Sequence, residues 1–398
     1  MIAKTYLCWL PGKYFGGAEK YAINLSLSFA QRGIKVYIVC PYYECYLQLS
    51  EILSNDNAVK DLPIHICHCN APSSSRLFKI PLIRSLYLLY WILQYKSLIS
   101  FINPDSIHIN LPFPSRSYAF ILAATKTKVP VTITFHLVPQ SLKLSNRYYR
   151  LYRRIIRVVT FTSVSHSNLT NLGNVLSIKR SLIKLIPNRP SPIGNRITQE
   201  QYNMLFGELN LNTNHFICTT VAALVPRKGY EDIINACRLV VERDQTYRFL
   251  FIGSGAHESS LRSLVESLDL AKYIHFVGQR SDVHELLQLS NVFVFASSSE
   301  GLSFALMEAV QHNIPLIAST RCGADEFLHP DIHYKSYENG NTAHLAHLLL
   351  DMKENYELAL ATANLAAKEL EKYDYNSMFS DTLDVLFRTR HLSDEISP

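Results

Sequence analysis

Residues 297–309 read SSSEGLSFALMEA, and this stretch directly follows a short apolar run, Val292–Phe295. The run has the length and composition of one buried strand. The polar residues after it include Glu300 and Gly301, and the segment Ser303–His312 is predicted to be a helix. The stretch therefore predicts a strand, a glycine-containing loop and a helix in direct succession.

The same succession recurs through the second half of the chain. Residues 221–229 read VAALVPRKG and lie between a predicted strand, Phe216–Val221, and a predicted helix, Tyr230–Val241. The other segments are strands Phe249–Ile252, Ile274–Val277 and Pro315–Ala318 and helices Ser259–Leu268 and Asp282–Leu289. Alternating strands and helices predict an α/β fold, a parallel sheet with helices on both faces.

The first half predicts a second sheet of this kind. Its segments are strands Thr5–Leu10, Val36–Val39, Leu62–Cys69, Val131–Phe135 and Val158–Val164 and a helix Ala18–Arg32 that Gly33 ends. Three prolines within Pro187–Pro192 predict a linker. We therefore expect two Rossmann-like, doubly wound domains, residues 1–190 and 191–372, facing a central cleft. A C-terminal helix within 373–398 would return to the first domain.

Composition excludes several classes of protein. Hydrophobic residues make up 48% of the 398 residues and charged residues 18%, which is a globular balance and not that of a disordered or fibrous chain. Eight cysteines do not form a disulfide framework at this length, and no signal peptide is recognised, so a reduced cytoplasmic protein is expected. Charge is uneven: residues 1–190 hold 23 Lys and Arg against 6 Asp and Glu, and the remainder holds 16 against 27. The first half should therefore meet an anionic partner.

Five motifs occur in order, each near a predicted strand end. Glu300 and Glu308 are separated by seven residues, and Lys228 lies in the loop after an earlier strand. The others are Gly16–Glu19 (GGAE), Phe135–His136 and Ile186–Asn188. Together they resemble the retaining glycosyltransferases of family 4, which have the two-domain GT-B fold, and the resemblance covers most of the chain.

The resemblance implies a role for each matching residue. Lys228 and Arg227 would meet the diphosphate of a nucleotide sugar, where a lysine acts as a point charge. Glu300 would hold the hydroxyls of the donor sugar and Glu308 the ribose diol, since carboxylates accept hydrogen bonds. His136, Glu300 and Lys228 are the catalytic candidates. The donor-binding candidates are Gly16, Gly17, Arg227, Lys228, Gly301, Leu302, Ser303, Phe304 and Glu308.

Elementary chemistry supports part of this assignment. The free N–H groups and the positive dipole end of a helix starting at Ser303 suit a diphosphate, although Ser303 could equally be a plain N-cap. Glycines at positions 16 and 17 leave room for phosphate or sugar against the backbone. A lone Lys-Arg pair or a lone histidine is often a solvated or structural feature, so the order of the motifs carries the assignment.

One position departs from the family. An arginine that usually stands two residues after the position of Val221, as a second diphosphate contact, is replaced by Ala223. Arg227 could substitute for it. The departure leaves two alternatives to a transferase open: a catalytically weak binding subunit of a glycosyltransferase complex, and a GT-B nucleotide-sugar epimerase.

Metal and cofactor sites are not predicted. The cluster His65, Cys67, His68 and Cys69 has one residue between its cysteines, whereas zinc sites usually have two to four, and it lacks a second ligand pair. No Asp-x-Asp sequence exists, so the metal-bound nucleotide site of the other large glycosyltransferase fold is not expected. Gly253-Ser254-Gly255 lacks the third glycine of a dinucleotide fingerprint and indicates a plain strand–helix turn.

The anionic partner is predicted to be a membrane. Within the apolar segment 80–102, the uncharged part spans 85–95, about half of the roughly 20 residues that cross a bilayer, so no transmembrane helix is expected. Within residues 143–157 basic residues alternate with aromatic and aliphatic ones, and together with the basic residues around the start of the apolar segment they are typical of interfacial surfaces. The basic set is Arg76, Lys79, Arg84, Lys143, Arg147, Arg150, Arg153, Arg154 and Arg157. A solvated basic helix is the alternative, and no nucleic-acid module is recognised.

These expectations combine into one function. The chain would transfer a hexose or an N-acetylhexosamine from a nucleoside-diphosphate sugar, UDP in first place, to a hydroxyl of a lipid-linked or polysaccharide-precursor acceptor. The acceptor would bind the first domain and the nucleotide the second. Such an enzyme would work at the inner face of the cytoplasmic membrane, in surface polysaccharide, capsule or lipopolysaccharide assembly.

Overall fold

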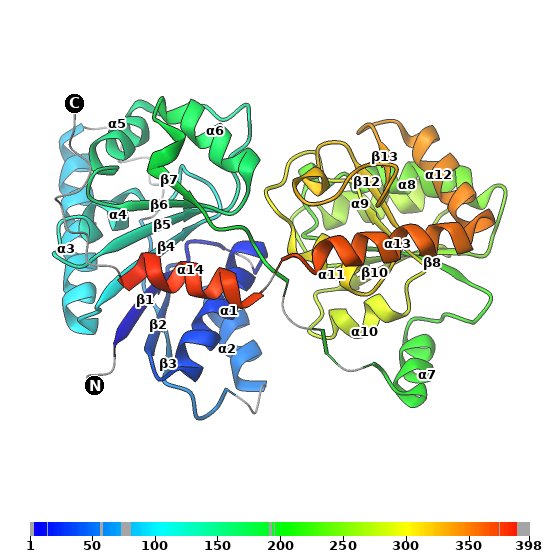
Figure 1. Ribbon diagram of the computed structural model, residues 1–398, viewed down its shortest axis with the longest axis horizontal. Helices are drawn as coiled ribbons and strands as arrows, with labels where there is room; N and C mark the ends of the chain where they lie inside the picture. Colours follow the sequence, from blue (N-terminus) through cyan, green and yellow to red (C-terminus); the bar gives the residue numbers. More distant parts are fainter. Residues whose placement is uncertain are drawn as a thin grey trace. The chain divides into compact units, whose positions relative to one another are not determined.

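The computed structural model describes residues 4–13, 15–55, 59–72, 81–190, 193–194, 196–373 and 375–387. The chain divides into two compact units, one formed by residues up to Asn188 and from Asn376 on, the other by Arg189–Tyr375 (Figure 1). Each unit is an α/β domain built on its own parallel sheet, as the alternation of strands and helices predicts.

The first unit contains a seven-stranded sheet among the described residues, in the order β3-β2-β1-β4-β5-β6-β7. Its strands are β1 (Thr5–Trp9), β2 (Lys35–Cys40), β3 (Ile64–His68), β4 (Ser106–Leu111), β5 (Val131–Phe135), β6 (Thr160–Ser163) and β7 (Ile183–Leu185). Its helices are α1 (Gly17–Gln31), α2 (Tyr43–Asn55), α3 (Pro81–Ile102), α4 (Tyr118–Ala124), α5 (Asn146–Ile155), α6 (His166–Leu176) and α14 (Tyr375–Phe387), with a 3-10 turn η2 at Arg180–Leu182. All pairings between neighbouring strands are parallel.

The second unit contains a six-stranded parallel sheet in the order β10-β9-β8-β11-β12-β13. Its strands are β8 (Phe216–Val221), β9 (Tyr247–Ile252), β10 (Ile274–Gly278), β11 (Val292–Phe295), β12 (Leu316–Ser319) and β13 (Lys335–Tyr337). Its helices are α7 (Gln199–Glu208), α8 (Tyr230–Val241), α9 (Glu258–Ser267), α10 (Val283–Gln288), α11 (Phe304–Gln311), α12 (Thr342–Glu354) and α13 (Tyr356–Leu370), with 3-10 turns η3 (Pro226–Lys228) and η4 (Ala324–Glu326).

Local sequence explains where these elements begin and end. Strands covered on both faces need continuous apolar runs, and β11, with the sequence VFVF, is buried along its whole length. Helix α1 ends where Gly33 adopts a left-handed conformation with φ +78°, and the amide of Ile34 closes the turn on the carbonyl of Phe29. The expected strands and helices are therefore present, with ends shifted by one or two residues.

The C-terminal helix α14 belongs to the first unit. Its Phe379 ring packs 4.9 Å from the ring of Phe29 on α1, and the guanidinium of Arg32 lies 3.9 Å from the Phe379 ring. The side chain of Lys4 lies over Phe387 at 4.6 Å. These contacts attach α14 to the face of the sheet that α1 covers.

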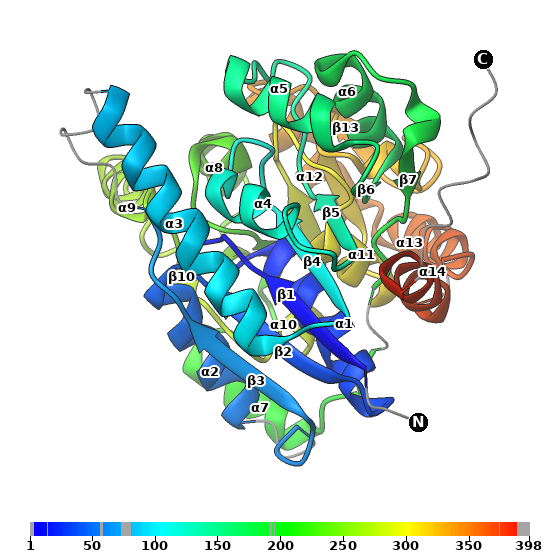
Figure 2. The same cartoon turned by 90° about the vertical axis from the view of Figure 1, so that its left-hand side faces the viewer.

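Helices α3, α4, α5 and α6 cover the opposite face of the first sheet (Figure 2). Helix α3 connects β3 to β4, and the later helices connect successive strands on the other side of β1. Right-handed crossovers place all of these connections on one face. None of the helices in the described ranges combines the length and apolar character required to cross a bilayer.

Candidate functional site

The second sheet reverses its strand order between β8 and β11. Strands β9 and β10 extend to one side of β8, and β12 and β13 extend to the other side of β11. The loops that leave β8 and β11 therefore diverge at the carboxyl edge of the sheet, and ligands of doubly wound folds bind at such a point. Lys228 lies in the first of these loops and Glu300 in the second.

The two loops are bonded tightly to one another. The backbone carbonyl of Arg227 accepts hydrogen bonds from the amide of Ser298 at 2.8 Å and from the hydroxyls of Ser297 and Ser298 at 3.2 and 3.1 Å. Gly229 has φ +66°, and a Cβ there would lie 2.3 Å from the carbonyl oxygen of Ala296. This glycine is therefore required by packing, and it holds both loops in a fixed relation.

Glu300 lies at the centre of a charged cluster. Its Oε1 is 2.5 Å from the Lys228 Nζ and 2.5 Å from Arg227 Nη1, and it accepts a 2.6 Å hydrogen bond from the Ser297 hydroxyl. The side chains of Lys228 and Glu300 are only 10% and 11% exposed, and that of Arg227 is 35% exposed. Two cations thus share one carboxylate in a largely desolvated place with an excess of positive charge.

Burial and charge act against each other on these pKa values. Burial alone would raise the pKa of Glu300, but Lys228, Arg227 and the Ser297 hydroxyl outweigh it and lower that pKa. Burial lowers the pKa of Lys228, and the attraction of Glu300 opposes this effect. The carboxylate is held ionised, and an anionic ligand that brought further negative charge would favour the charged form of Lys228.

Helix α11 starts beside this cluster. The Ser303 hydroxyl caps the helix by accepting a 3.5 Å hydrogen bond from the amide of Leu306, so Ser303 is the N-cap, one of its two expected roles. The side chains of Leu302 and Phe304 are buried in the core. Their apolar side chains therefore offer little surface to a ligand.

Glu308 and Gly301 also belong to this edge of the sheet. Glu308 lies in α11 and is 2% exposed, so it does not face solvent. Gly301 is buried, and a Cβ added at Gly323, in the loop after β12, would lie 2.3 Å from its carbonyl oxygen. The loops after three adjacent strands therefore converge around Glu300.

Gly16 and Gly17 precede and open α1 in the first unit. A Cβ at Gly17 would have no atom of the described chain within 4 Å, and at Gly16 only the Glu19 carboxylate, at 3.4 Å. Packing within the unit does not require glycine at Gly17, in contrast to Gly229. The open space above it is what close approach of a ligand to the backbone needs.

His136 follows β5 and is buried. Its Nε2 lies 3.3 Å from the Asn110 Oδ1, and its ring packs edge-on against Tyr21 with the ring centres 4.9 Å apart. Asn110 donates its amide hydrogen to the Cys8 sulfur, so its Oδ1 is the atom that faces the histidine and Nε2 carries the proton. Burial lowers the pKa of His136 to about 3. The imidazole is therefore neutral near pH 7, with its lone pair on Nδ1.

The residues expected at the site thus form two groups. Lys228, Arg227 and Glu300 are in direct contact, with Gly301, Leu302, Ser303, Phe304 and Glu308 following on the same loop and helix. Gly16, Gly17 and His136 follow strand ends in the first unit. Sequence reasoning missed Ser297, although it lies three residues before Glu300, and it missed Asn110 and Tyr21, whose contacts with His136 no local pattern indicates.

Metal ligands do not cluster in the described part of the chain. No group of three or more His, Cys, Asp or Glu side chains there is arranged to hold a metal ion. The eight cysteines are all unpaired thiols.

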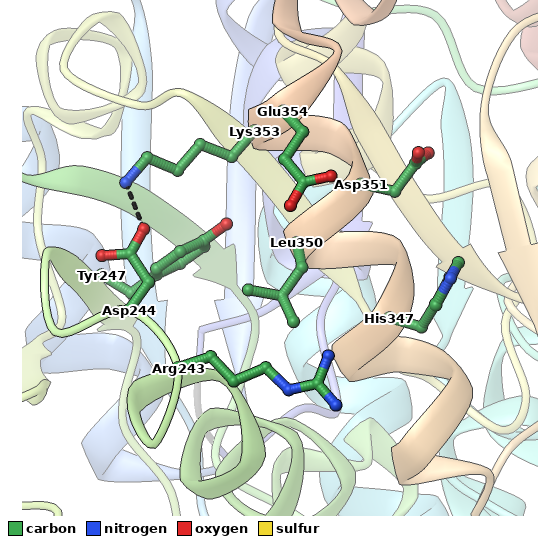
Figure 3. A pocket seen from close by; sticks show the side chains of 8 residues that line it. All are labelled: Arg243, Asp244, Tyr247, His347, Leu350, Asp351, Lys353 and Glu354. Atoms are coloured by element: carbon green, nitrogen blue, oxygen red, sulfur yellow. Dashed lines mark hydrogen bonds and ion pairs between the residues drawn. The ribbon is translucent and has the colours of Figure 1, made fainter.

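A surface pocket of about 510 Å³ lies elsewhere in the second unit (Figure 3). Its lining includes Asp244, Tyr247 and Lys353, and the Lys353 Nζ lies 2.5 Å from the Asp244 carboxylate. Tyr247 is the first residue of β9, so this pocket is at the amino edge of the sheet, opposite the edge that carries Lys228 and Glu300.

Two parallel-sheet units, each with candidate ligand contacts at the carboxyl ends of its strands, define the GT-B class of nucleotide-sugar enzymes. Family models identify the class further. Residues 15–188 match the model described as Glycosyltransferase Family 4, and residues 203–369 match Glycosyl transferases group 1. The chain belongs to the family 4 glycosyltransferases with the GT-B fold.

Individual relatives agree with this membership. An uncharacterized glycosyltransferase of Methanocaldococcus jannaschii is 26% identical over 193 residues, which span 48% of this chain and 45% of that protein, less than half of each. The alpha-monoglucosyldiacylglycerol synthase of Acholeplasma laidlawii is 21% identical over 92% of this chain and 94% of its own length. The crystal structure of Anabaena Alr3699/HepE with UDP and glucose has a TM-score of 0.75 at 16% identity, covering 96% of this chain and 98% of that one, and supports the fold.

Proposed function

We propose that this protein is a retaining glycosyltransferase. It transfers a hexose or an N-acetylhexosamine from a UDP-sugar to a hydroxyl of a lipid-linked or polysaccharide-precursor acceptor. The observation that carries the proposal is the cluster of Lys228, Arg227 and Glu300 at the switch point of the second sheet. UDP is chosen as the nucleotide because it is the one named in the HepE structure.

The donor diphosphate would take the place that Glu300 now holds on the two cations. Lys228 and Arg227 would neutralise the phosphates, and the amides at the start of α11 would add the positive end of the helix. Glu300, released from its cations, would accept hydrogen bonds from the sugar hydroxyls. Glu308 would hold the ribose diol.

The chemical step would be attack from the same face. The bond between the anomeric carbon and the diphosphate oxygen breaks, the acceptor oxygen bonds to the anomeric carbon on that face, and the acceptor proton passes to the leaving diphosphate. Neither a side-chain nucleophile nor a general base of the protein enters this step. The protein contributes positive charge where the leaving group develops negative charge, from Lys228 and the amides of α11.

These protein cations would also make a metal ion unnecessary. In a metal-dependent site a divalent ion neutralises the diphosphate, whereas here Lys228, Arg227 and the helix amides supply that charge. We therefore propose transfer without a metal or an organic cofactor. Activity retained in the presence of a chelator would support this, and loss of activity restored by a divalent ion would refute it.

The first unit would provide the acceptor side of the reaction. The open backbone at Gly17 would admit the acceptor or the transferred sugar, and the neutral His136 would contact a sugar hydroxyl through Nδ1. Membership of this family together with the A. laidlawii relative, a diacylglycerol glycolipid synthase by name, supports a lipid-linked acceptor. Such an acceptor would place the enzyme at the inner face of the cytoplasmic membrane.

Ala223 favours one competing function, that of a binding subunit with little catalysis. Ala223 leaves the cluster with Arg227 and Lys228 as its cations, and Arg227 is partly engaged by Glu300 and by the carbonyl of Ser299 at 3.2 Å. The epimerase alternative has no contact in the described residues that favours it.

The deciding experiment incubates the full chain with a panel of UDP- and GDP-sugars and a short glycolipid acceptor. Mass spectrometry identifies the product, and proton NMR of the anomeric hydrogen gives its configuration. An α-linked product from an α-configured donor supports the proposal. A β-linked product would refute retention, an epimerised free donor would identify an epimerase, and nucleotide binding without turnover on any acceptor would indicate the binding subunit.

A further inference from the structure

Helix α3 leaves a continuous apolar surface uncovered. Leu86, Leu89, Tyr90 and Leu93 are 60%, 49%, 53% and 56% exposed and recur at helical spacing. We call these four residues the apolar ridge. Charged residues do not interrupt it, because α3 contains no acidic residue and its basic residues, Arg84 and Lys96, lie outside the ridge. Side chains this large are normally buried, so a run of them on one helix face indicates a partner.

The opposite face of α3 explains why the helix stays attached to the unit. Ile92, Tyr95 and Ile99 are buried in the core of the first sheet, and the Tyr95 ring packs edge-on against Trp9 at 5.2 Å. The helix is thus apolar on both sides, with one side used by the fold. Substitutions in the apolar ridge should therefore leave folding intact.

The surroundings of the ridge carry positive charge. Between Asp61 and Glu200 the sequence contains a single acidic residue, Asp105. Asp105 accepts a 2.7 Å hydrogen bond from the amide of Thr5, at the amino edge of the sheet. No carboxylate within this long segment therefore offsets the basic residues beside the ridge.

The basic side chains and the ridge lie on one face of the unit. Helices α3, α4 and α5 cover the same side of the sheet, and α3 is in contact with α4 (Figure 2). Helix α5 is joined to α4 by Tyr118 and Tyr148, whose rings are 5.2 Å apart, and the Arg147 guanidinium lies 5.1 Å from each of them. Lys143 and Arg150 are exposed beside it.

The direction of the helices locates the ridge along this face. A helix between two parallel strands runs back from the carboxyl edge of the sheet to its amino edge. The ridge occupies the first half of α3, so it lies toward the carboxyl edge. Gly17 and His136 follow strand ends at that same edge.

We propose that the apolar ridge inserts into the headgroup region of an anionic membrane, while Lys143 and Arg150 bind its lipid phosphates. This rests on the proposed function, because it explains how a lipid-linked acceptor reaches the carboxyl edge of the first sheet. Aliphatic side chains flanked by exposed basic ones are the features of an interfacial anchor.

Charge distinguishes the membrane from other occupants of the ridge. A second copy of this chain would bring the same basic surface against itself, and like charges oppose such a contact. A nucleic acid would satisfy the basic residues but would leave the leucines in water. A bilayer with anionic headgroups accommodates both kinds of side chain.

One basic residue has a different role. The Arg153 guanidinium donates to the carbonyls of Leu176 and Ser177 at 3.3 and 2.8 Å, so it closes the end of α6. Arg76 and Lys79, which the sequence also suggests for this surface, lie outside the described residues. None of these three is used in the test.

The test measures sedimentation of the full chain with phosphatidylcholine vesicles and with vesicles that contain phosphatidylglycerol, without nucleotide. Leu86→Ser, Leu89→Ser and Leu93→Ser together should reduce partitioning of the protein onto anionic vesicles at least tenfold. The same changes should abolish the vesicle binding that the parent retains at high salt. Lys143→Ser and Arg150→Ser together should reduce partitioning onto anionic vesicles about 25-fold at low salt, since each basic residue contributes about fivefold, or about 1 kcal/mol.

Two control variants match these changes. Lys126→Ser and Lys128→Ser remove two charges from residues after α4, toward the other edge of the same face, and Leu358→Ser with Leu365→Ser removes exposed leucines from α13. Both controls should bind vesicles within threefold of the parent. Circular dichroism verifies the fold of every variant.

Several outcomes would overturn the proposal. These are equal binding to neutral and anionic vesicles, full binding by the triple leucine variant, and equal loss in the charge control. A parent dimer that becomes monomeric in the leucine variant with vesicle binding unchanged would assign the ridge to self-association. Calorimetry of UDP binding in the absence of vesicles does not depend on this surface. Loss of vesicle binding alone would therefore leave the proposed function standing. A protein that binds vesicles but not UDP would refute the proposed function alone.

Discussion

Replacing Glu300 by glutamine should separate nucleotide binding from sugar transfer. The carboxylate holds Lys228 and Arg227 at 2.5 Å, so an incoming diphosphate must compete with it for both cations. Two anions that share one ammonium lie about 4–5 Å apart, and unit charges at about 4 Å repel by about 4 kcal/mol at an effective dielectric constant of about 20. Glu300→Gln removes this competition and keeps the shape of the side chain.

Part of that gain is lost because the two freed cations then repel each other and are solvated differently. We therefore expect UDP to bind Glu300→Gln about 1–2 kcal/mol more tightly, or about 5–30-fold. Transfer should nevertheless fall at least 100-fold, because the acceptor of the sugar hydroxyl bonds is gone. Isothermal titration calorimetry with UDP and a transfer assay at saturating donor measure the two effects.

Glu308→Gln is the matched control, since this carboxylate is proposed to hold the ribose. It should weaken UDP binding and raise the KM for the donor while changing kcat little. UDP binding that weakens fivefold or more in a folded Glu300→Gln protein would show that Glu300 supports the nucleotide directly and does not compete with it. Identical behaviour of the two variants would refute the division of roles.

Four further predictions concern Lys228, Ala223, Gly17 and Glu19. Lys228→Ala should lower kcat/KM at least tenfold, because a charged hydrogen bond contributes about 1.5–3 kcal/mol, while folding survives since Arg227 still pairs with the carboxylate; unchanged donor kinetics would count against the assignment. Ala223→Arg should tighten UDP binding if the site lacks a cation. If Arg227 already fills that place, the new arginine should leave UDP binding equal or weaker. Calorimetry with UDP on Ala223→Arg, on Arg227→Ala and on the variant that carries both changes distinguishes the two cases. Gly17→Ala should abolish most transfer yet leave the free energy of unfolding equal or slightly higher, because no atom within 4 Å opposes the new methyl group; a large loss of stability would show that the glycine is structural. Burial raises the pKa of Glu19 to about 7, so the folded state favours the protonated carboxyl. The contribution of this protonated carboxyl to the free energy of unfolding is present below pH about 4.5 and is lost as pH rises to about 7, by about 3 kcal/mol. Denaturant unfolding at a series of pH values should show this decrease in the parent and not in Glu19→Gln.

Most of the fold could be predicted from the sequence because parallel strands leave a simple signal. Buried runs such as Phe216–Val221 and Val131–Phe135 coincide with β8 and β5, and Gly33 ends α1 as expected. The strand β4 was missed for a physical reason. Its sequence SIHINL is half polar, and all six residues are buried.

The polar residues of β4 are tolerated because of partners from other strands. The His108 ring lies between the Tyr6 hydroxyl at 2.8 Å and the Thr134 hydroxyl at 2.6 Å, and burial lowers its pKa to about 3. Asn110 contacts Cys8 and His136. Partners that lie 26 to 102 residues away in the chain leave no trace in a local pattern.

The candidate site shows the same limit. The motifs around Lys228 and Glu300 could be recognised in the sequence, and both residues were expected at strand ends. Their direct contact spans 72 residues, and only the order of β8 and β11 in the sheet creates it. The sequence therefore suggested that Lys228 meets phosphate and Glu300 meets sugar, and the structure adds that each is the other's partner before a ligand binds.

The central claim is that the diphosphate of a nucleotide sugar binds at Lys228 and displaces Glu300. A crystal structure of the protein with UDP or a non-hydrolysable UDP-sugar tests it most directly. The account predicts phosphate oxygens within hydrogen-bonding distance of the Lys228 Nζ and of the amides at the start of α11, with Glu300 no longer on Lys228. UDP bound elsewhere, for example in the pocket beside Arg243 and Lys353, with the Lys228–Glu300 contact intact, would contradict it.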